Sequence, residues 1–82
     1  MKLRIRLFAS FREAVGSGTL AWDAPTDATV SQVVAALQEA YPRLGPTAEK
    51  ALLAVNQEYV GGDFRLHDGD ELALIPPVSG GA

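Results

Sequence analysis

The chain has 82 residues, a length that suits one small domain and leaves no room for two. Hydrophobic residues make up 48% and charged residues 21%, which is typical of a globular protein and argues against disorder. The net charge of −3 argues against nucleic acid as a partner, and no uncharged run is long enough to span a membrane. The N-terminus lacks the apolar stretch of a signal peptide, so we expect a cytoplasmic protein.

Residue counts exclude most catalytic centres. The chain has no cysteine and one histidine, so disulfides, thiolate metal sites, cysteine nucleophiles and three-histidine metal sites are excluded. A Ser-His-Asp triad stays formally possible, but His67 lies in a Leu-His-Asp-Gly-Asp sequence that is typical of a tight surface turn. The neighbouring acids lack the spacing of a calcium loop and are interpreted as turn residues. They are Asp63, Asp68, Asp70 and Glu71.

Residues 2 to 8 alternate between apolar and basic side chains, the period-two pattern of a half-buried strand. The apolar face comprises Leu3, Ile5 and Leu7, and the basic face comprises Lys2, Arg4 and Arg6. Three charges without stacking aromatic residues between them are typical of a solvated sheet face rather than of a nucleic-acid stripe. Phe8 has the opposite parity from the apolar set, so it is predicted to point outward.

Two short elements follow. Residues 9–15 predict a small helix that is capped by Ser10 and stopped by Gly16. Residues 19–23 predict a second strand, and the short link before it makes the two strands antiparallel neighbours. The single tryptophan, Trp22, is expected to be buried at the sheet edge rather than to form a ligand cage.

The clearest helix begins at Thr29, which forms a capping box with Gln32. Its apolar stripe consists of Val30, Val33, Val34, Leu37 and Tyr41. Pro42 ends the helix. Residues 43–50 are less regular and have room for one helical turn.

The last third of the chain is rich in strands. Residues 52–55 are apolar on both faces, which predicts a strand inside a sheet, and 56–60 predict a turn with a short extension. Residues 61–63 form a turn, Phe64 and Leu66 belong to a covering segment, and 71–75 form the last strand. The order predicts an α+β fold in which one main helix packs across a mixed sheet. Parallel first and last strands at its centre would place Phe8 beside Ile75.

After residue 75 the chain reads Pro-Pro-Val-Ser-Gly-Gly-Ala. The two prolines cannot continue a ladder and favour an extended conformation, and glycines suit a narrow channel. The alternative is a frayed terminus without a function. We therefore expect a domain over 1–75 and an extended, flexible tail over 76–82.

Four segments carry a resemblance to a known family. They are Leu-Phe-Ala-Ser-Phe-Arg-Glu-Ala-Val-Gly at 7–16, Ala-Val-Asn-Gln-Glu at 54–58, Asp-Gly-Asp-Glu at 68–71 and Pro-Pro-Val-Ser-Gly-Gly at 76–81. Over its whole length the chain resembles the small subunits of molybdopterin synthase, which are ubiquitin-like sulfur carriers. The resemblance implies the β-grasp fold, which agrees with the predicted order of elements.

The resemblance also implies a chemistry that needs no reactive side chain. An adenylating, E1-like enzyme would use ATP to activate the carboxylate of Gly81, and a sulfur donor protein would convert it to a thiocarboxylate. The tail, with Gly80 and Gly81, would enter the active site of the large subunit. There it would donate sulfur to cyclic pyranopterin monophosphate in molybdenum cofactor biosynthesis. The chain would thus bind no cofactor, would not be an enzyme on its own, and would form a heterotetramer of two small and two large subunits.

By the same resemblance, the partner would bind around the root of the tail. The interface residues so implied are Phe8, Arg12, Tyr59, Ile75, Pro76, Pro77 and Val78. For Phe8 and Ile75 the alternative is an ordinary place in the core.

Ala82 departs from the family, whose members end at the second glycine. We expect it to be removed before activation, or the chain to be cut from a longer one such as a fusion to the large subunit. The alternatives in function are a carrier of the same fold for thiamine synthesis, tRNA thiolation or protein tagging, and a non-catalytic ubiquitin-like binding module.

Overall fold

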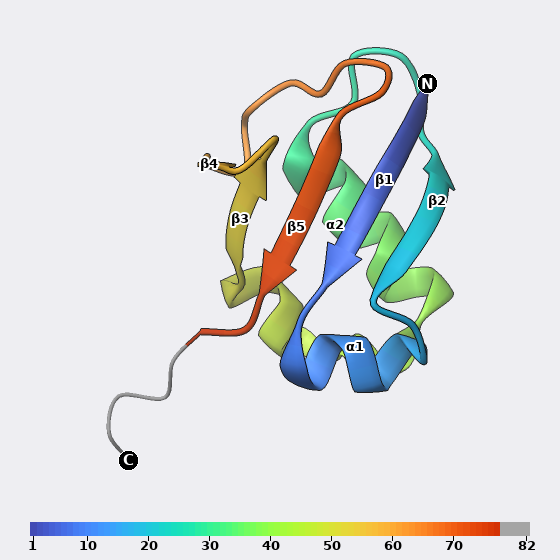
Figure 1. Cartoon of the computed structure of the whole chain (residues 1–82), viewed down its shortest axis with the longest axis vertical. Coiled ribbons are helices and arrows are strands. Elements are labelled where there is room, and N and C mark those ends of the chain that lie inside the picture. The colour runs from blue at the N-terminus through green and yellow to red at the C-terminus, as the bar shows by residue number, and fades with distance from the viewer. Residues whose placement is uncertain (78–82) are drawn as a thin grey trace.

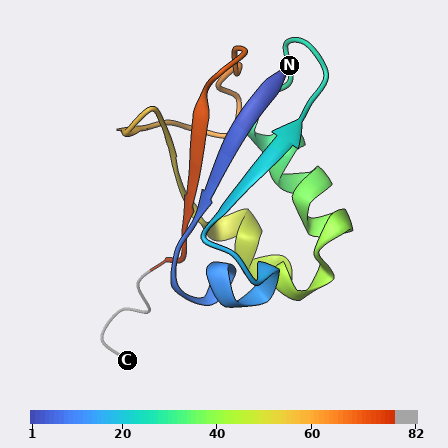
Figure 2. The same ribbon diagram turned by 45° about the vertical axis from the view of Figure 1, so that its right-hand side comes forward.

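The computed structural model describes residues 1–77. Its elements are β1 (Lys2–Leu7), α1 (Ala9–Val15), β2 (Thr19–Asp23), α2 (Val30–Ala40), the 3₁₀ helices η1 (Pro42–Leu44) and η2 (Pro46–Lys50), β3 (Leu52–Val55), β4 (Glu58–Tyr59) and β5 (Glu71–Ile75). The strands form one mixed sheet in the order β2-β1-β5-β3-β4. In Figure 1 α2 lies behind the sheet and α1 lies below the ends of β1 and β5, and the view in Figure 2 separates α2 from the sheet. The predicted α+β architecture is confirmed.

The two central strands are the first and the last in the chain. β1 pairs antiparallel with β2 and parallel with β5, with Leu7 opposite Leu74. The predicted apolar face of β1 is buried, because Leu3, Ile5 and Leu7 are each at most 4% exposed. Since parallel strands end at the same edge, Phe8 follows β1 at the place where Ile75 ends β5.

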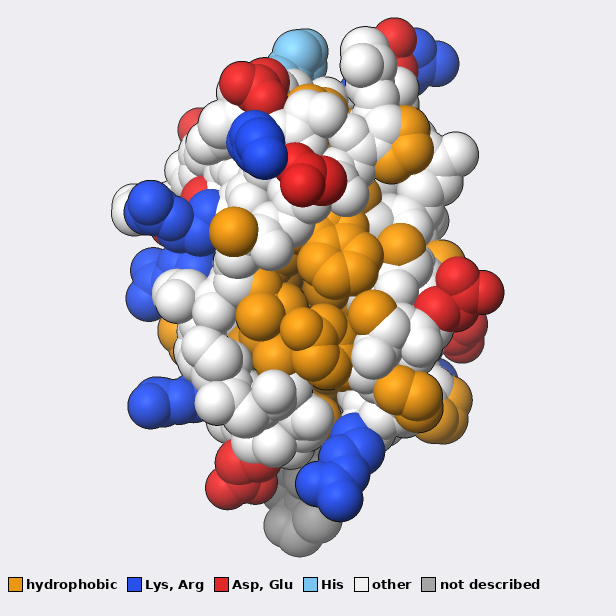
Figure 3. All heavy atoms as spheres, turned by 90° about the vertical axis from the view of Figure 1, so that its right-hand side faces the viewer, with side chains coloured by type: hydrophobic (Ala, Val, Ile, Leu, Met, Phe, Trp, Pro, Cys, Tyr) orange, Lys and Arg blue, Asp and Glu red, His pale blue; other side chains and the backbone are white. Residues whose placement is uncertain are grey.

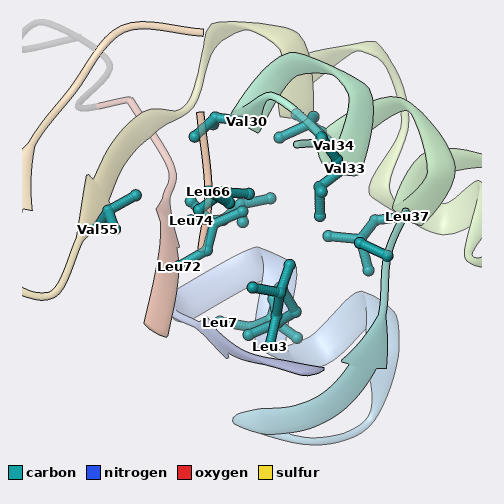
Figure 4. Close-up of a cluster of buried hydrophobic side chains, with 14 of the residues drawn as sticks. Leu3, Leu7, Val30, Val33, Val34, Leu37, Val55, Leu66, Leu72 and Leu74 are labelled. Carbon is teal, nitrogen blue, oxygen red and sulfur yellow. The ribbon is translucent and has the colours of Figure 1, made fainter. Parts of the chain in front are cut away.

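Helix α2 supplies the other half of the core. The predicted capping box is present: the Gln32 N–H donates to Thr29 Oγ1 at 3.3 Å, and the Thr29 N–H donates to Gln32 Oε1 at 2.9 Å. The buried stripe comprises Val30, Val33, Val34 and Leu37. In Figure 4 these side chains face those of Leu3, Leu72 and Leu74 from the sheet.

The open side of the core lies along β2, the edge strand. Leu20 and Trp22 project toward the helix layer, are half-buried and pack against the core. Figure 3 looks at this side and shows hydrophobic side chains gathered between the sheet and the helices. Trp22 packs at the sheet edge as predicted, but it is half-buried rather than buried, because no strand pairs with β2 on its outer side.

The predicted cap of α1 is wrong. The N-cap residue is Phe8, and no side chain caps the helix. Ala9 turns the chain with a left-handed φ of 49°, so the helix begins one residue before Ser10, which then lies inside the first turn. The predicted stop is confirmed, because Gly16 has a φ of 88° and its N–H donates to the Arg12 carbonyl at 2.8 Å.

Strand β3 is less covered than its sequence predicts. It lies between β5 and β4, but β4 pairs only with Ala54 and Val55, and Leu52 is left 45% exposed. In the covering segment Leu66 is buried, whereas Phe64 is 38% exposed. The irregular stretch before β3 contains two 3₁₀ helices where one turn was expected.

Side-chain hydrogen bonds hold the turn before β5. The Asp70 carboxylate accepts from the His67 N–H at 2.7 Å and from Asn56 Nδ2 at 2.9 Å, and Asp68 accepts from the Lys2 N–H at 2.6 Å. The His67 side chain is 80% exposed, so the predicted surface turn is confirmed.

Among residues 1–77 no three His, Asp or Glu side chains gather as metal ligands. Within the same residues no helix has the length and apolar character that crossing a membrane requires.

The two predicted caps make a matched test. Thr29→Ala is expected to lower the free energy of unfolding by about 1 kcal/mol, because it removes the hydroxyl that caps α2. Ser10→Ala removes a hydroxyl that makes no capping bond and is expected to change it by less than about 0.5 kcal/mol. Urea denaturation of both variants checks this. Equal losses would mean that Ser10 does cap α1.

Candidate functional site

One face of the sheet carries no helix, and we call it the outer face (Figures 1 and 2). Side chains that alternate with the buried ones project from it. The strand register aligns Arg6, Ala73, Ala54 and Tyr59 in one row across four strands. Alanines therefore occupy the middle of the row, with larger side chains on both sides.

The small central residues leave a hollow of about 210 Å³ in the outer face. We call it the outer-face hollow, and its lining residues are Arg6, Phe8, Ala54, Gln57, Tyr59, Glu71, Ala73 and Ile75. It thus brings together Phe8, Tyr59 and Ile75, three of the residues predicted for the partner interface. The strand that leads into the tail ends at its rim.

Phe8 lies in the wall of the hollow, between a sharp turn at Ala9 and the guanidinium of Arg6. The left-handed φ of Ala9 costs a non-glycine residue roughly 1 kcal/mol, and it turns the chain into α1 directly after Phe8. The Arg6 guanidinium lies 5.2 Å from the centre of the Phe8 ring, and Arg6 Nη1 is 3.7 Å from Glu71 Oε1. Phe8 and Ile75 are half-buried and stand outside the buried core, so the outward parity predicted for Phe8 is confirmed.

A tight hairpin presents Tyr59, whose side chain is 74% exposed. Asn56 and Gln57 both have positive φ, 51° and 73°, as the two central residues of a type I′ turn do. The Asn56 amide anchors this turn to β5: Nδ2 donates to Asp70 Oδ1 at 2.9 Å, and Oδ1 accepts from the Glu71 N–H at 3.0 Å. The position of Tyr59 is therefore tied to the strand that precedes the tail.

The remaining predicted interface residues do not line the hollow. Arg12 is exposed on α1, where its side chain lies over Gly18. Pro76 is half-buried and Pro77 exposed, and both follow β5 outside any strand. The other calls on the tail, Val78, Gly80, Gly81 and Ala82, lie outside the described residues.

Sequence reasoning missed Leu52. It lies opposite Ile75 in the pairing of β3 with β5, so it extends the apolar part of the outer face. The neighbouring residues in β3 are also apolar, which predicted a strand that is covered on both faces. The available signal was its parity with Ala54, which separates it from the more buried Leu53 and Val55.

A mixed sheet packed on one main helix, with its first and last strands parallel at the centre, defines a ubiquitin-like β-grasp protein. More narrowly, the chain belongs to the ThiS family, whose family model matches residues 5–81.

Individual relatives and structures agree with this family. The molybdopterin synthase sulfur carrier subunit of Dictyostelium discoideum is 41% identical over 83 residues, which are 98% of this chain and 96% of the relative. The crystal structure of SAMP1 from Haloferax volcanii matches with a TM-score of 0.86 and 34% identity, covering 98% and 99% of the two chains. A complex of subunits 1 and 2 of molybdopterin-converting factor from Helicobacter pylori contains a chain that matches with a TM-score of 0.70 and 25% identity, covering 98% and 99%. The resemblance drawn from the sequence is confirmed.

The outer face should be dispensable for folding. Tyr59→Ser is expected to change the free energy of unfolding by less than about 0.5 kcal/mol, because the side chain is mostly in solvent. Leu74→Ala, on the buried face of β5, is expected to cost about 2–5 kcal/mol. Urea denaturation measures both. A loss at Tyr59 as large as that at Leu74 would make it a structural residue.

Proposed function

We propose that the chain is a sulfur carrier that bears a thiocarboxylate on Gly81 and acts as the small subunit of molybdopterin synthase. The observation that carries this proposal is the outer-face hollow at the root of the tail, in a chain of the ThiS family. The name of the Dictyostelium relative supports the same function. The chain contributes a terminal carboxylate, and its partners contribute the catalytic groups.

The chemistry proceeds in two steps on that carboxylate. Once hydrolysis of the Gly81–Ala82 peptide bond has freed the Gly81 carboxylate, one of its oxygens attacks the α-phosphorus of ATP in the active site of an adenylating enzyme, and pyrophosphate leaves. Sulfide supplied by a sulfur donor then attacks the carbonyl carbon of the acyl-adenylate, the bond from that carbon to AMP breaks, AMP leaves, and a thiocarboxylate remains. ATP is bound by the adenylating enzyme, so the small chain needs no cofactor of its own. The absence of cysteine from the whole sequence fits a carrier whose sulfur is held by the main chain.

The large subunit is the partner of the outer face in this proposal. Phe8, Tyr59 and Ile75 offer it an apolar contact, and Pro76 and Pro77 lead the chain away from that contact. A docked partner would thus meet the tail at a fixed place, which positions the terminal sulfur for attack on cyclic pyranopterin monophosphate. The complex of two subunits from Helicobacter pylori supports a partner of this kind, and we propose two copies of each subunit.

Protein tagging is the second candidate, because the likeness to SAMP1, a small archaeal modifier protein, is also close. Both functions begin with the acyl-adenylate and differ in what attacks it. Sulfur gives a thiocarboxylate, whereas a lysine amine gives an isopeptide bond. Intact-mass analysis of the chain from its native cells separates the two, since only tagging joins it to other proteins.

The residue at the end of the chain should decide whether the chain is activated. We compare chains that end at Ser79, Gly81 and Ala82, each with the adenylating enzyme, ATP and a sulfur source, and without a protease. The Gly81 form is expected to gain the mass difference between sulfur and oxygen. The Ala82 form should react about a hundredfold more slowly, because it displaces the carboxylate by one residue. The Ser79 form should be inert and equally stable.

Two outcomes would contradict this prediction. Equal sulfur loading of the Gly81 and Ala82 forms would show that removal of Ala82 is unnecessary. Sulfur transfer by the Ser79 form would disprove the role of the two glycines.

Phe8→Asp tests the outer face as an interface. A carboxylate in a desolvated apolar contact is unfavourable, so the affinity for the large subunit is expected to fall about thirtyfold or more. The matched control is Phe64→Asp, which changes another partly exposed phenylalanine away from the hollow and should leave the affinity unchanged. Calorimetric titration gives the affinity, and thermal melting reports folding. Unfolding of Phe8→Asp alone would assign Phe8 to the core.

A further inference from the structure

The outer face is basic, although the chain as a whole is acidic. Three of the seven Lys and Arg residues, Lys2, Arg4 and Arg6, alternate along β1 on this face, while the net charge of the chain is −3. In Figure 3 the outer face is at the left, and blue side chains follow that margin. Asp23 and Glu71 share this face with the three cations, so β1 and its two neighbours leave an excess of one positive charge there, opposite in sign to the net charge of the chain.

Arg4 is the cation of this row that has no partner. Lys2 Nζ lies 3.1 Å from Asp23 Oδ1, and Arg6 contacts Glu71 at 3.7 Å. Within residues 1–77 Arg4 makes no ion pair, even though the register places it between Ala21 on β2 and Glu71 on β5. Its guanidinium therefore remains available for a carboxylate from outside.

A groove of about 440 Å³ runs beside Arg4 over β1 and β2, and we call it the β1–β2 groove. Its lining residues are Lys2, Leu3, Arg4, Thr19, Leu20, Ala21, Gly69 and Glu71. Ala21 has a small side chain and Gly69 has none, which leaves space beside the two cations. Glu71 also lines the outer-face hollow, so the groove and the hollow are adjacent.

We propose that the β1–β2 groove receives an acidic segment of the protein that docks on the outer-face hollow, with Arg4 as its principal contact. The inference rests on the proposed function and assigns the chemistry of the partner: Asp or Glu side chains beside an apolar patch. A protein fits better than a nucleic acid, because one unpaired guanidinium can pair with one carboxylate. A run of phosphates needs several free cations, and Lys2 and Arg6 are already paired with Asp23 and Glu71. Charges at the rim of an interface act mainly on the rate of association.

The experiment measures the association rate constant with the purified large subunit of molybdopterin synthase from the same organism. Arg4→Glu is expected to lower this constant about tenfold at low salt, and the difference should vanish at high salt. Arg4→Lys should retain the wild-type rate because it keeps the charge. The matched control is Arg43→Glu, which makes the same charge change at an exposed residue of η1 and should alter the rate less than about twofold.

Each result supports or overturns the inference. An Arg4→Glu rate equal to that of Arg43→Glu at low salt overturns it, while wild-type binding still supports the proposed function. Wild type that does not bind the large subunit overturns both. Tight binding of a single-stranded oligonucleotide that Arg4→Glu abolishes, with no change in the rate for the large subunit, assigns the groove to nucleic acid instead. Thermal melting checks folding, and Arg4→Ala, with an expected intermediate rate, replaces Arg4→Glu if that variant melts early.

Discussion

The parallel pairing of β1 with β5 holds the first and last strands side by side at the centre of the sheet. On the inner face this pairing buries Ile5, Leu72 and Leu74 completely, and α2 closes over them. On the outer face it brings Phe8 and Ile75 to the same edge. The core and the candidate site thus depend on the same ladder of hydrogen bonds, seen from its two sides.

A domain of this size has few side chains with which to build a core, so apolar groups left outside it are informative. Leu52 and Tyr59 are among the large hydrophobic residues exposed in the described part of the chain, and both lie on the outer face. Apolar surface kept on one face, beside the strand that leads to the tail, is what a docking protein needs and what folding does not require. The strained turn at Ala9 fits the same interpretation, because it holds Phe8 in the wall of the hollow.

Most of the fold could be predicted from local patterns. The alternation in β1 and the capping box of α2 depend on neighbours within a few residues, and both are present in the structure. The exposure of Leu52 was missed although its parity with Ala54 indicated it, because the cover over β3 depends on β4, which is only two residues long. The predicted cap at Ser10 was wrong because Ala9 adopts a left-handed φ, which nothing in an alanine side chain predicts.

The candidate site could be predicted only in part, because it combines residues that are far apart in the chain. Parity alone predicted that Phe8 points outward, while Tyr59 was suggested by resemblance to a family. The β1–β2 groove depends on which residues face each other across the strands. For residues as far apart in the chain as Arg4 and Glu71, local sequence patterns do not predict that pairing.

The central position of β5 also has a consequence for how the chain folds. While the ribosome is still making the protein, the β1–β2 hairpin and α2 can form, but the middle of the sheet stays open until β5 emerges. In the nascent chain the edge of β1 that pairs with β5 therefore has no partner strand for most of the synthesis. The segment that completes the sheet is also the one that carries the tail, so the root of the tail takes its place only in a finished domain.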